Sequence, residues 1–90
     1  MKISWDPAKA RANFQKHQIR FADAEAVLYD PDAITIEDPD TEMQQRFVTM
    51  GIDAGGRILV VVYAYQGEDI RLISARRASP GESKGYEKRV

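Results

Sequence analysis

Cysteine is absent from this sequence, and histidine occurs only once, at position 17. The absence of thiols excludes disulfides and thiolate-bound metal ions, and one imidazole is too few for a histidine-based metal site. The single histidine also excludes the histidine pair with which some ribonucleases transfer protons. No apolar run approaches the about 20 residues that a membrane-spanning helix needs, and the first ten residues do not resemble a signal peptide. We therefore expect a soluble, cytoplasmic protein without metal or cofactor, folded as one domain over residues 1–90.

Charge is distributed unevenly along the chain, although the formal net charge is only −1. Residues 1–20 carry five Lys and Arg against one Asp, and residues 71–90 carry six against two Glu. Residues 21–45 carry eight Asp and Glu and no basic residue. A uniformly basic nucleic-acid binder would not have this pattern. If the two basic ends meet in space, they form a positive patch for a phosphate-rich ligand beside an acidic surface for a basic partner.

Two helices are predicted near the N-terminus. Asp6 can cap the first helix, with Pro7 at its first position, and the helix runs to about Gln18. A second, short helix covers about 22–29 and ends at the breaker sequence 30–32.

A third helix is predicted near the C-terminus. Ser79 can cap it, Pro80 suits its first turn, and Glu82 can reach back to complete a capping box. This helix runs to about Lys88.

Extended segments are predicted for the rest of the chain. A short edge strand covers 3–5, and four further strands are expected at 33–37, 46–53, 58–65 and 70–76. Turns at 54–56 and 66–69 connect the last three strands. The sequence therefore predicts an α+β fold, in which two N-terminal helices and one C-terminal helix pack on one face of an antiparallel sheet meander.

Acidic side chains crowd the region that follows the second helix. They are Asp30, Asp32, Glu37, Asp38, Asp40 and Glu42. Their spacing matches no calcium-binding loop, because the required glycine and the bidentate glutamate are missing. A surface for a basic partner, a solvated loop and a metal site all remain open, and the first is favoured.

One face of the first helix gathers groups that can bind phosphate. Lys9, Asn13, Lys16 and His17 fall within an arc of about 100° on the helical wheel. His17 lies at the boundary between core and solvent, where it either stabilises the helix end or handles a phosphate or a proton. The residues alone do not decide between these two roles.

Arginines on the sheet form the second candidate group. Ile70 and Leu72 should face the core, which places Arg76 on their side of a regular strand and Arg71 and Arg77 on the other. Arg76 and Arg77 therefore cannot serve one site while the strand stays regular.

Two further residues complete this group. Arg46 begins another strand of the meander, and Tyr86 lies one turn after Glu82 on the last helix. Guanidinium groups bind phosphate oxygens bidentately and can stabilise a developing negative charge, so the group suits a phosphodiester. The alternative is that each arginine forms a surface ion pair.

The order and spacing of these residues resemble the BrnT family of toxins. The resemblance rests on Trp5-Asp6, Lys9, Asn13, Lys16-His17, Phe21 and Ala24, on Gly51, Arg57 and Leu59 to Tyr63, and on the run from Ile70 to Ala78 with Glu82 and Tyr86. It covers nearly the whole chain. Two positions depart from the family pattern, because Gln18 stands where a glycine is usual and Arg77 where lysine is commoner.

The resemblance implies a RelE-like fold and a metal-independent endoribonuclease that cleaves RNA to inhibit translation and growth. Enzymes of this kind direct the ribose 2′-hydroxyl onto the adjacent phosphate and leave a cyclic phosphate. On this basis Arg46, Arg71 and either Arg76 or Arg77 would hold the phosphate. Lys9, Lys16 and Asn13 would contact the RNA, and His17 or Tyr86 would handle the proton.

The same resemblance implies a partner. A BrnA-like antitoxin with a ribbon-helix-helix part would neutralise the toxin, and DNA would be bound only through the complex of the two. A basic antitoxin could contact the acidic segment 21–45. A second hypothesis is a non-catalytic module that assembles with the antitoxin and co-represses their operon, since a fold alone does not establish an activity.

Overall fold

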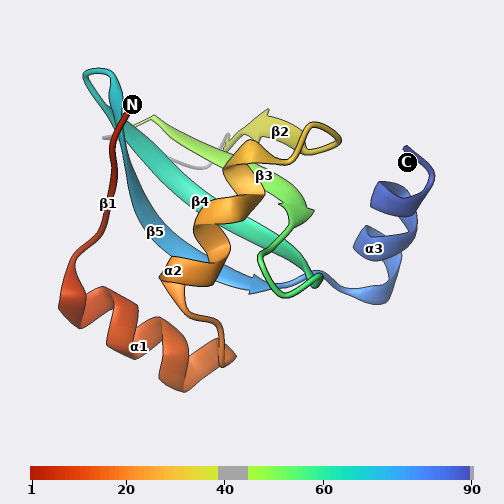
Figure 1. Cartoon of the computed structure of the whole chain (residues 1–90), viewed down its shortest axis with the longest axis horizontal. Coiled ribbons are helices and arrows are strands. Elements are labelled where there is room, and N and C mark those ends of the chain that lie inside the picture. The colour runs from red at the N-terminus through yellow and green to blue at the C-terminus, as the bar shows by residue number, and fades with distance from the viewer. Residues whose placement is uncertain (39–44, 90) are drawn as a thin grey trace.

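Five strands, three α-helices and one 3-10 helix make up the part of the chain that the computed structural model describes, residues 1–38 and 45–89 (Figure 1). In chain order they are β1 (Ile3–Ser4), α1 (Pro7–His17), α2 (Phe21–Ala24), η1 (Glu25–Tyr29), β2 (Ile34–Glu37), β3 (Arg46–Ile52), β4 (Ile58–Gln66), β5 (Asp69–Arg77) and α3 (Pro80–Glu87). The predicted α+β class is confirmed. None of the described helices is long and apolar enough to cross a membrane.

The strands form one mixed sheet in the order β1-β5-β4-β3-β2. Strands β2 to β5 are the predicted antiparallel meander. The predicted edge strand is also present, and its direction, which the prediction left open, is parallel: β1 pairs with β5 at the edge of the sheet, with Ile3 opposite Ile70. This pairing brings the first residues of the chain beside its last strand.

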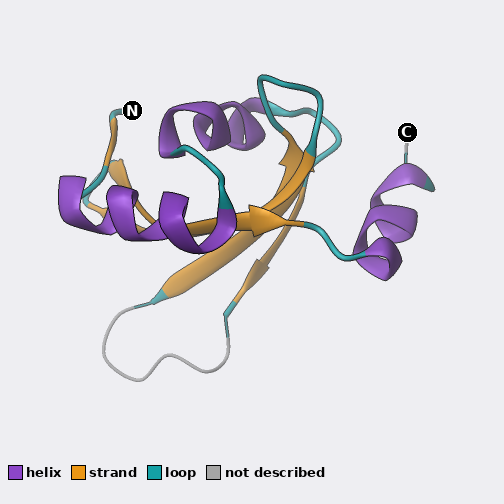
Figure 2. Ribbon diagram, turned by 90° about the horizontal axis from the view of Figure 1, so that it is seen from below, coloured by secondary structure: helices purple, strands orange, loops and turns teal. Residues whose placement is uncertain are grey.

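A layer of N-terminal helices covers one face of the sheet (Figure 2). Phe21 and Val27 from this layer are buried against Leu59, Val61 and Leu72 of the sheet. The second predicted helix was expected to be continuous over 22–29. The chain instead forms one short α-helical turn, α2, and continues as the 3-10 helix η1.

The C-terminal helix α3 does not pack on the sheet face, which corrects the predicted arrangement. It lies beyond the ends of the strands, at the opposite end of the molecule from α1 (Figures 1 and 2). The predicted capping box of Ser79 and Glu82 is present. The physical reason for the different position is composition: Tyr86 is the buried residue of this helix, so α3 has no apolar stripe to place on a sheet.

A β-bulge divides β5 into two halves. Val62 of β4 lies opposite Ser74, whereas its neighbour Tyr63 lies opposite Leu72, so Ile73 is an extra residue in β5. The alternation of side chains shifts at this point, and both Leu72 and Ala75 are fully buried.

This shift overturns one prediction about the arginines. Arg71 and Arg76 were expected on opposite faces of a regular strand, but the bulge places both on the face away from the helices. Arg77 lies on the helix-covered side, opposite Leu59. The sequence pattern could not show this, because a bulge is defined by the register with the neighbouring strand.

Candidate active site

A groove of about 230 Å³ runs between helix α1 and strand β5. Its lining consists of Lys9, Ala12, Asn13, Lys16, His17, Ile73 and Ser74. The predicted basic face of the first helix therefore does come together, and the two residues at the bulge of β5 form the opposite wall. None of these lining residues is acidic, and two of them are lysines.

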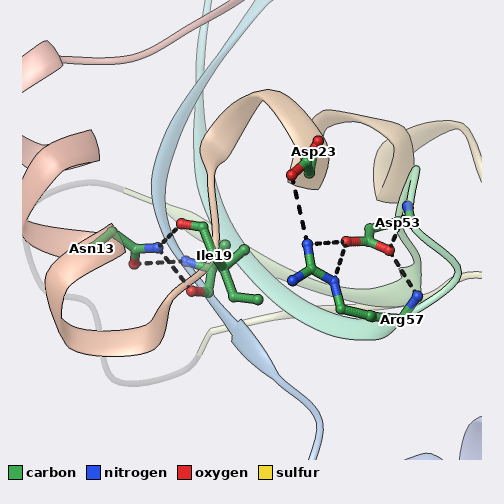
Figure 3. A network of polar contacts seen from close by, with 7 residues as sticks. Asn13, Ile19, Asp23, Asp53 and Arg57 are labelled. Carbon is green, nitrogen blue, oxygen red and sulfur yellow. Dashed lines mark hydrogen bonds and ion pairs between the residues drawn. The ribbon is translucent and has the colours of Figure 1, made fainter.

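Asn13 fixes the width of this groove. Its side chain is only 7% exposed, and its Oδ1 accepts a hydrogen bond of 3.0 Å from the N–H of Ala75. Its Nδ2 donates to the carbonyl oxygens of Ala75 at 2.9 Å and of Ile19 at 3.1 Å (Figure 3). The side chain thus pairs with β5 as a neighbouring strand would, where β1 has already ended. Asn13 was predicted to contact RNA, and in the structure both ends of its amide bond to the backbone, so that it positions α1.

Two lysines and the histidine remain available in the groove. Lys9 and Lys16 are exposed, and His17 is half-buried at the last residue of α1. The carbonyl end of a helix favours a nearby cation, and Lys16 and His17 lie in the last turn of α1. Ser74 adds a half-buried hydroxyl on the opposite wall. Such a set can bind a phosphate and exchange a proton with it.

Arginines line the face of the sheet that adjoins this groove. Arg46, Ala64 and Arg71 form one row across β3, β4 and β5, because each is directly opposite the next. Arg76 lies on the same face, opposite Val60. The Nε atom of Arg46 is buried and has no hydrogen-bond partner among the described residues.

Arg76 already has an anionic partner. Its Nη1 and Nη2 atoms donate to Glu82 Oε1 and Oε2 at 2.8 and 3.0 Å. This pairing, together with the N–H of Ser79, lowers the pKa of Glu82 to about 2, and the same contact raises the pKa of Arg76. Arg76, which was predicted as a possible phosphate-binding residue, therefore also forms the brace that joins β5 to α3. Arg77 is exposed on the other face of the sheet.

Tyr86 is far from the groove. It is 4% exposed, and its hydroxyl donates to Asp30 Oδ2 at 2.5 Å. That hydrogen bond and burial raise the pKa of Tyr86 to about 12. Because α3 and α1 lie at opposite ends of the molecule (Figure 1), Tyr86 and His17 cannot act on the same proton.

The carboxylate of Asp30 joins three segments. Burial raises its pKa, but the hydrogen bonds from Tyr86 and from the N–H groups of Ile52 and Asp32 outweigh this and lower it overall. Within residues 1–38 and 45–89, no three His, Cys, Asp or Glu side chains gather as a metal site requires. Asp40 and Glu42 of the predicted acidic cluster lie outside the described residues.

Sequence reasoning missed a polar network at the turn between β3 and β4. Buried Asp53 accepts hydrogen bonds from the N–H groups of Gly55 and Arg57 and from Arg57 Nε, and Arg57 also reaches Asp23 at 3.6 Å (Figure 3). The signal was an aspartate before two glycines, since such a carboxylate often closes a turn. The network stabilises the turn and connects it to α2.

A larger pocket of about 430 Å³ lies on another side of α1. It is lined mainly by apolar groups, including Trp5, Phe14 and Phe21, and Arg20 stacks on Phe14 at 5.6 Å. It contains no histidine and no lysine. The smaller groove is therefore the better candidate for phosphate chemistry.

Comparison with known proteins identifies the family of the chain. The family model described as the ribonuclease toxin BrnT of type II toxin–antitoxin systems matches residues 5–82. The crystal structure of the Brucella abortus ribonuclease toxin BrnT is similar to this fold, with a TM-score of 0.68 and 34% sequence identity over 88% of this chain and 97% of that one. No match is found among curated proteins. The chain belongs to the BrnT family of ribonuclease toxins of type II toxin–antitoxin systems.

Proposed function

We propose that this chain is a metal-independent endoribonuclease that cleaves RNA in the groove between α1 and β5. The observation that carries the proposal is the meeting of Lys9, Lys16 and His17 with Ser74 in one groove without a carboxylate. RNA cleavage by the 2′-hydroxyl needs cations around the phosphate and a group that exchanges protons. The groove supplies both.

Each group in the groove then has a role. Lys9 and Lys16 hold the scissile phosphate, and His17 in its neutral form accepts the proton of the 2′-hydroxyl. The bond from O2′ to phosphorus forms as the bond from phosphorus to O5′ breaks. The departing O5′ takes a proton from water, protonated His17 returns its proton to the solvent, and a 2′,3′-cyclic phosphate remains. Arg71, on the adjoining sheet face, binds a neighbouring phosphate of the strand.

Three predicted residues have smaller roles in this proposal. Tyr86 is removed as the proton carrier, because it is buried on Asp30 at the other end of the molecule. Arg77 points to the helix-covered side, and Arg76 acts mainly through its brace to Glu82.

The setting of the activity follows from the family. Membership in a type II toxin–antitoxin family implies an antitoxin partner. We propose that the toxin acts in the cytoplasm with a RelE-like mechanism that inhibits translation. A BrnA-like ribbon-helix-helix antitoxin would neutralise it, and the complex would bind operator DNA through the antitoxin.

The cleavage proposal predicts the effect of removing two cations. Purified, EDTA-treated protein is incubated with a model RNA and with total RNA, beside a Lys9→Ala, Lys16→Ala double variant. We expect this variant to cleave at least about 100-fold more slowly, because it loses the groups that stabilise the developing charge. Rates are followed by gel electrophoresis, and the cyclic phosphate is identified by mass spectrometry.

A matched control removes two other lysines. Lys84→Ala with Lys88→Ala makes the same change in net charge, in α3 and at its C-cap outside the groove, and should cleave at the wild-type rate. Intact RNA with the folded wild-type chain, or equal losses in both double variants, would contradict the proposal. A chain that also fails to arrest growth when expressed without antitoxin would instead be the non-catalytic module.

A further inference from the structure

One face of the sheet is covered by none of the described helices. Helices α1 and α2 lie on the opposite face, and α3 lies beyond the strand ends (Figure 2). The strand registers place apolar side chains on this open face, and they are Ile34, Ile36, Val48, Met50, Ile52, Val60 and Val62. We call this set the open apolar strip.

The open apolar strip is partly exposed to solvent. Ile36 is 59% exposed and Ile52 is 40% exposed, while Val48, Met50 and Val62 are half-buried. Val60, at the centre of the strip, is buried. A contiguous, partly exposed apolar surface is typical of an interaction site.

Positive charge borders the strip on one side. Arg46, Arg71 and Arg76 share the face with it, and the buried Nε of Arg46 lacks an acceptor among the described residues. The strands bring one carboxylate to this face, Asp69, and its Oδ1 accepts a hydrogen bond from the N–H of Lys2. Arg76 is paired with Glu82 of α3, whereas Arg71 has no ion pair among the described residues. The face therefore combines aliphatic contact area with a cation, Arg71, that can receive a carboxylate.

This combination selects among possible occupants. A second copy of the chain would press arginines against arginines, which is unfavourable at an interface. Single-stranded RNA is bound by aromatic platforms and cations, but this strip is built from Ile, Val and Met. A protein segment with aliphatic side chains and carboxylates fits both parts of the face.

We propose that the open apolar strip and its bordering arginines dock a segment of the antitoxin that carries aliphatic and acidic side chains. The inference rests on the family's antitoxin partner rather than on the cleavage proposal. Docking there covers Arg71, beside the groove, so the antitoxin would hinder access of RNA to the site. The acidic segment 21–45 is not needed for this contact.

The test measures affinity for the chain's own purified antitoxin by isothermal titration calorimetry. An Ile36→Glu, Ile52→Glu double variant places two charges on the most exposed positions of the strip. We expect the Kd to rise about 100-fold, because burying these carboxylates opposes binding. Tyr29→Glu, at a residue 63% exposed on η1, is the matched control and should bind as the wild type does.

A second pair of variants tests the charge of Arg71 and leaves the apolar residues of the strip unchanged. Arg71→Glu should raise the Kd by about 10-fold or more, whereas Arg77→Glu, on the other face of the same strand, should leave it unchanged. Circular dichroism confirms that each variant is folded. Wild-type affinity in the Ile36→Glu, Ile52→Glu variant and in Arg71→Glu would overturn the proposal.

Other occupants give their own results. A wild-type dimer in light scattering that the strip variant converts to a monomer would assign the face to a second copy and overturn the proposal. The strip variant could also lose as much RNA cleavage as the Lys9→Ala, Lys16→Ala variant does. That result would assign the open face to RNA and would likewise overturn the proposal. Failure of the cleavage proposal can be distinguished from failure of the docking proposal. In the first case the wild-type chain leaves RNA intact but still binds the antitoxin through the strip.

Discussion

Gln18 is the clearest case of strain at a single residue. It ends α1 with φ +60°, in the left-handed region that favours glycine, and its Nε2 donates to the carbonyl oxygen of Gln15 at 3.3 Å. A side chain in this conformation costs about 1 kcal/mol relative to glycine. The departure from the family pattern noted in the sequence therefore carries a cost in stability.

The first prediction follows from this strain. Gln18→Gly should raise the free energy of unfolding by about 1 kcal/mol, measured by urea denaturation. Gln18→Ala keeps the strained backbone and loses the hydrogen bond to Gln15, so it should give no increase. A glycine variant less stable than the wild type would show that the side-chain contact outweighs the strain.

The grouping of residues in the candidate site was largely predictable from the sequence, but the contacts of Asn13 were not. The helical wheel placed Lys9, Lys16 and His17 on one face, and the structure brings them into one groove. Asn13 shared that face on the wheel, yet its partner Ala75 is 62 residues away. The amide of Asn13 reaches the backbone of β5, and bonds to it as a neighbouring strand would, only because α1 packs on β5. Local spacing does not contain that information.

Among the elements, α3 depends on a few polar contacts with the rest of the molecule. Arg76 to Glu82 and Tyr86 to Asp30 are the chief ones, since the helix carries no apolar stripe. Its bounds were predictable from the capping box, because that signal is local. Its position was not, because it depends on partners from distant segments.

The brace from Arg76 to Glu82 makes the stability depend on pH. The folded pKa of Glu82 is about 2, below its ordinary value of 4.5. The stability from its ionised form is therefore present above about pH 4.5 and is lost as the pH falls towards 2. Both side chains are more than a third exposed, so solvent screening leaves a contribution of about 1 kcal/mol.

The second prediction compares Glu82→Gln with the wild type. Glutamine can keep the capping box but cannot form the ion pair. The variant should be about 1 kcal/mol less stable at pH 7 and equal to the wild type near pH 2, measured by denaturation across this range. A difference that does not change with pH would show that the charge of Glu82 does not stabilise the fold.

Charge is organised at the scale of the whole molecule. The sequence predicted a positive patch if its basic ends met, and α1 and β5 do lie side by side (Figures 1 and 2). The cations of α3 lie at the other end, so only part of the C-terminal charge joins the patch. The asymmetry was predictable from composition, and the parallel pairing of β1 with β5 explains how the ends meet.

The third prediction concerns the salt dependence of RNA binding. A single-stranded RNA with 2′-O-methyl groups cannot be cleaved through its 2′-oxygen, so fluorescence anisotropy can measure its affinity for the chain at several salt concentrations. Removing Lys9 and Lys16 should reduce the slope of log K against log salt by about 1.4, or about 0.7 for each phosphate that is no longer neutralised. The Lys84→Ala, Lys88→Ala variant should retain the wild-type slope. An unchanged slope in the groove variant would mean that these lysines do not touch phosphate.

The hydrogen bonds between Asn13 and Ala75 have a consequence for the synthesis of the toxin. They join residues 62 positions apart, so one wall of the groove is made early and the other late. Pairing over such separations forms slowly, because a long loop must close first. A chain whose synthesis stops before β5 has the cations of α1 but no groove. If the groove is the active site, as proposed, a chain that ends before β5 is therefore expected not to cleave RNA.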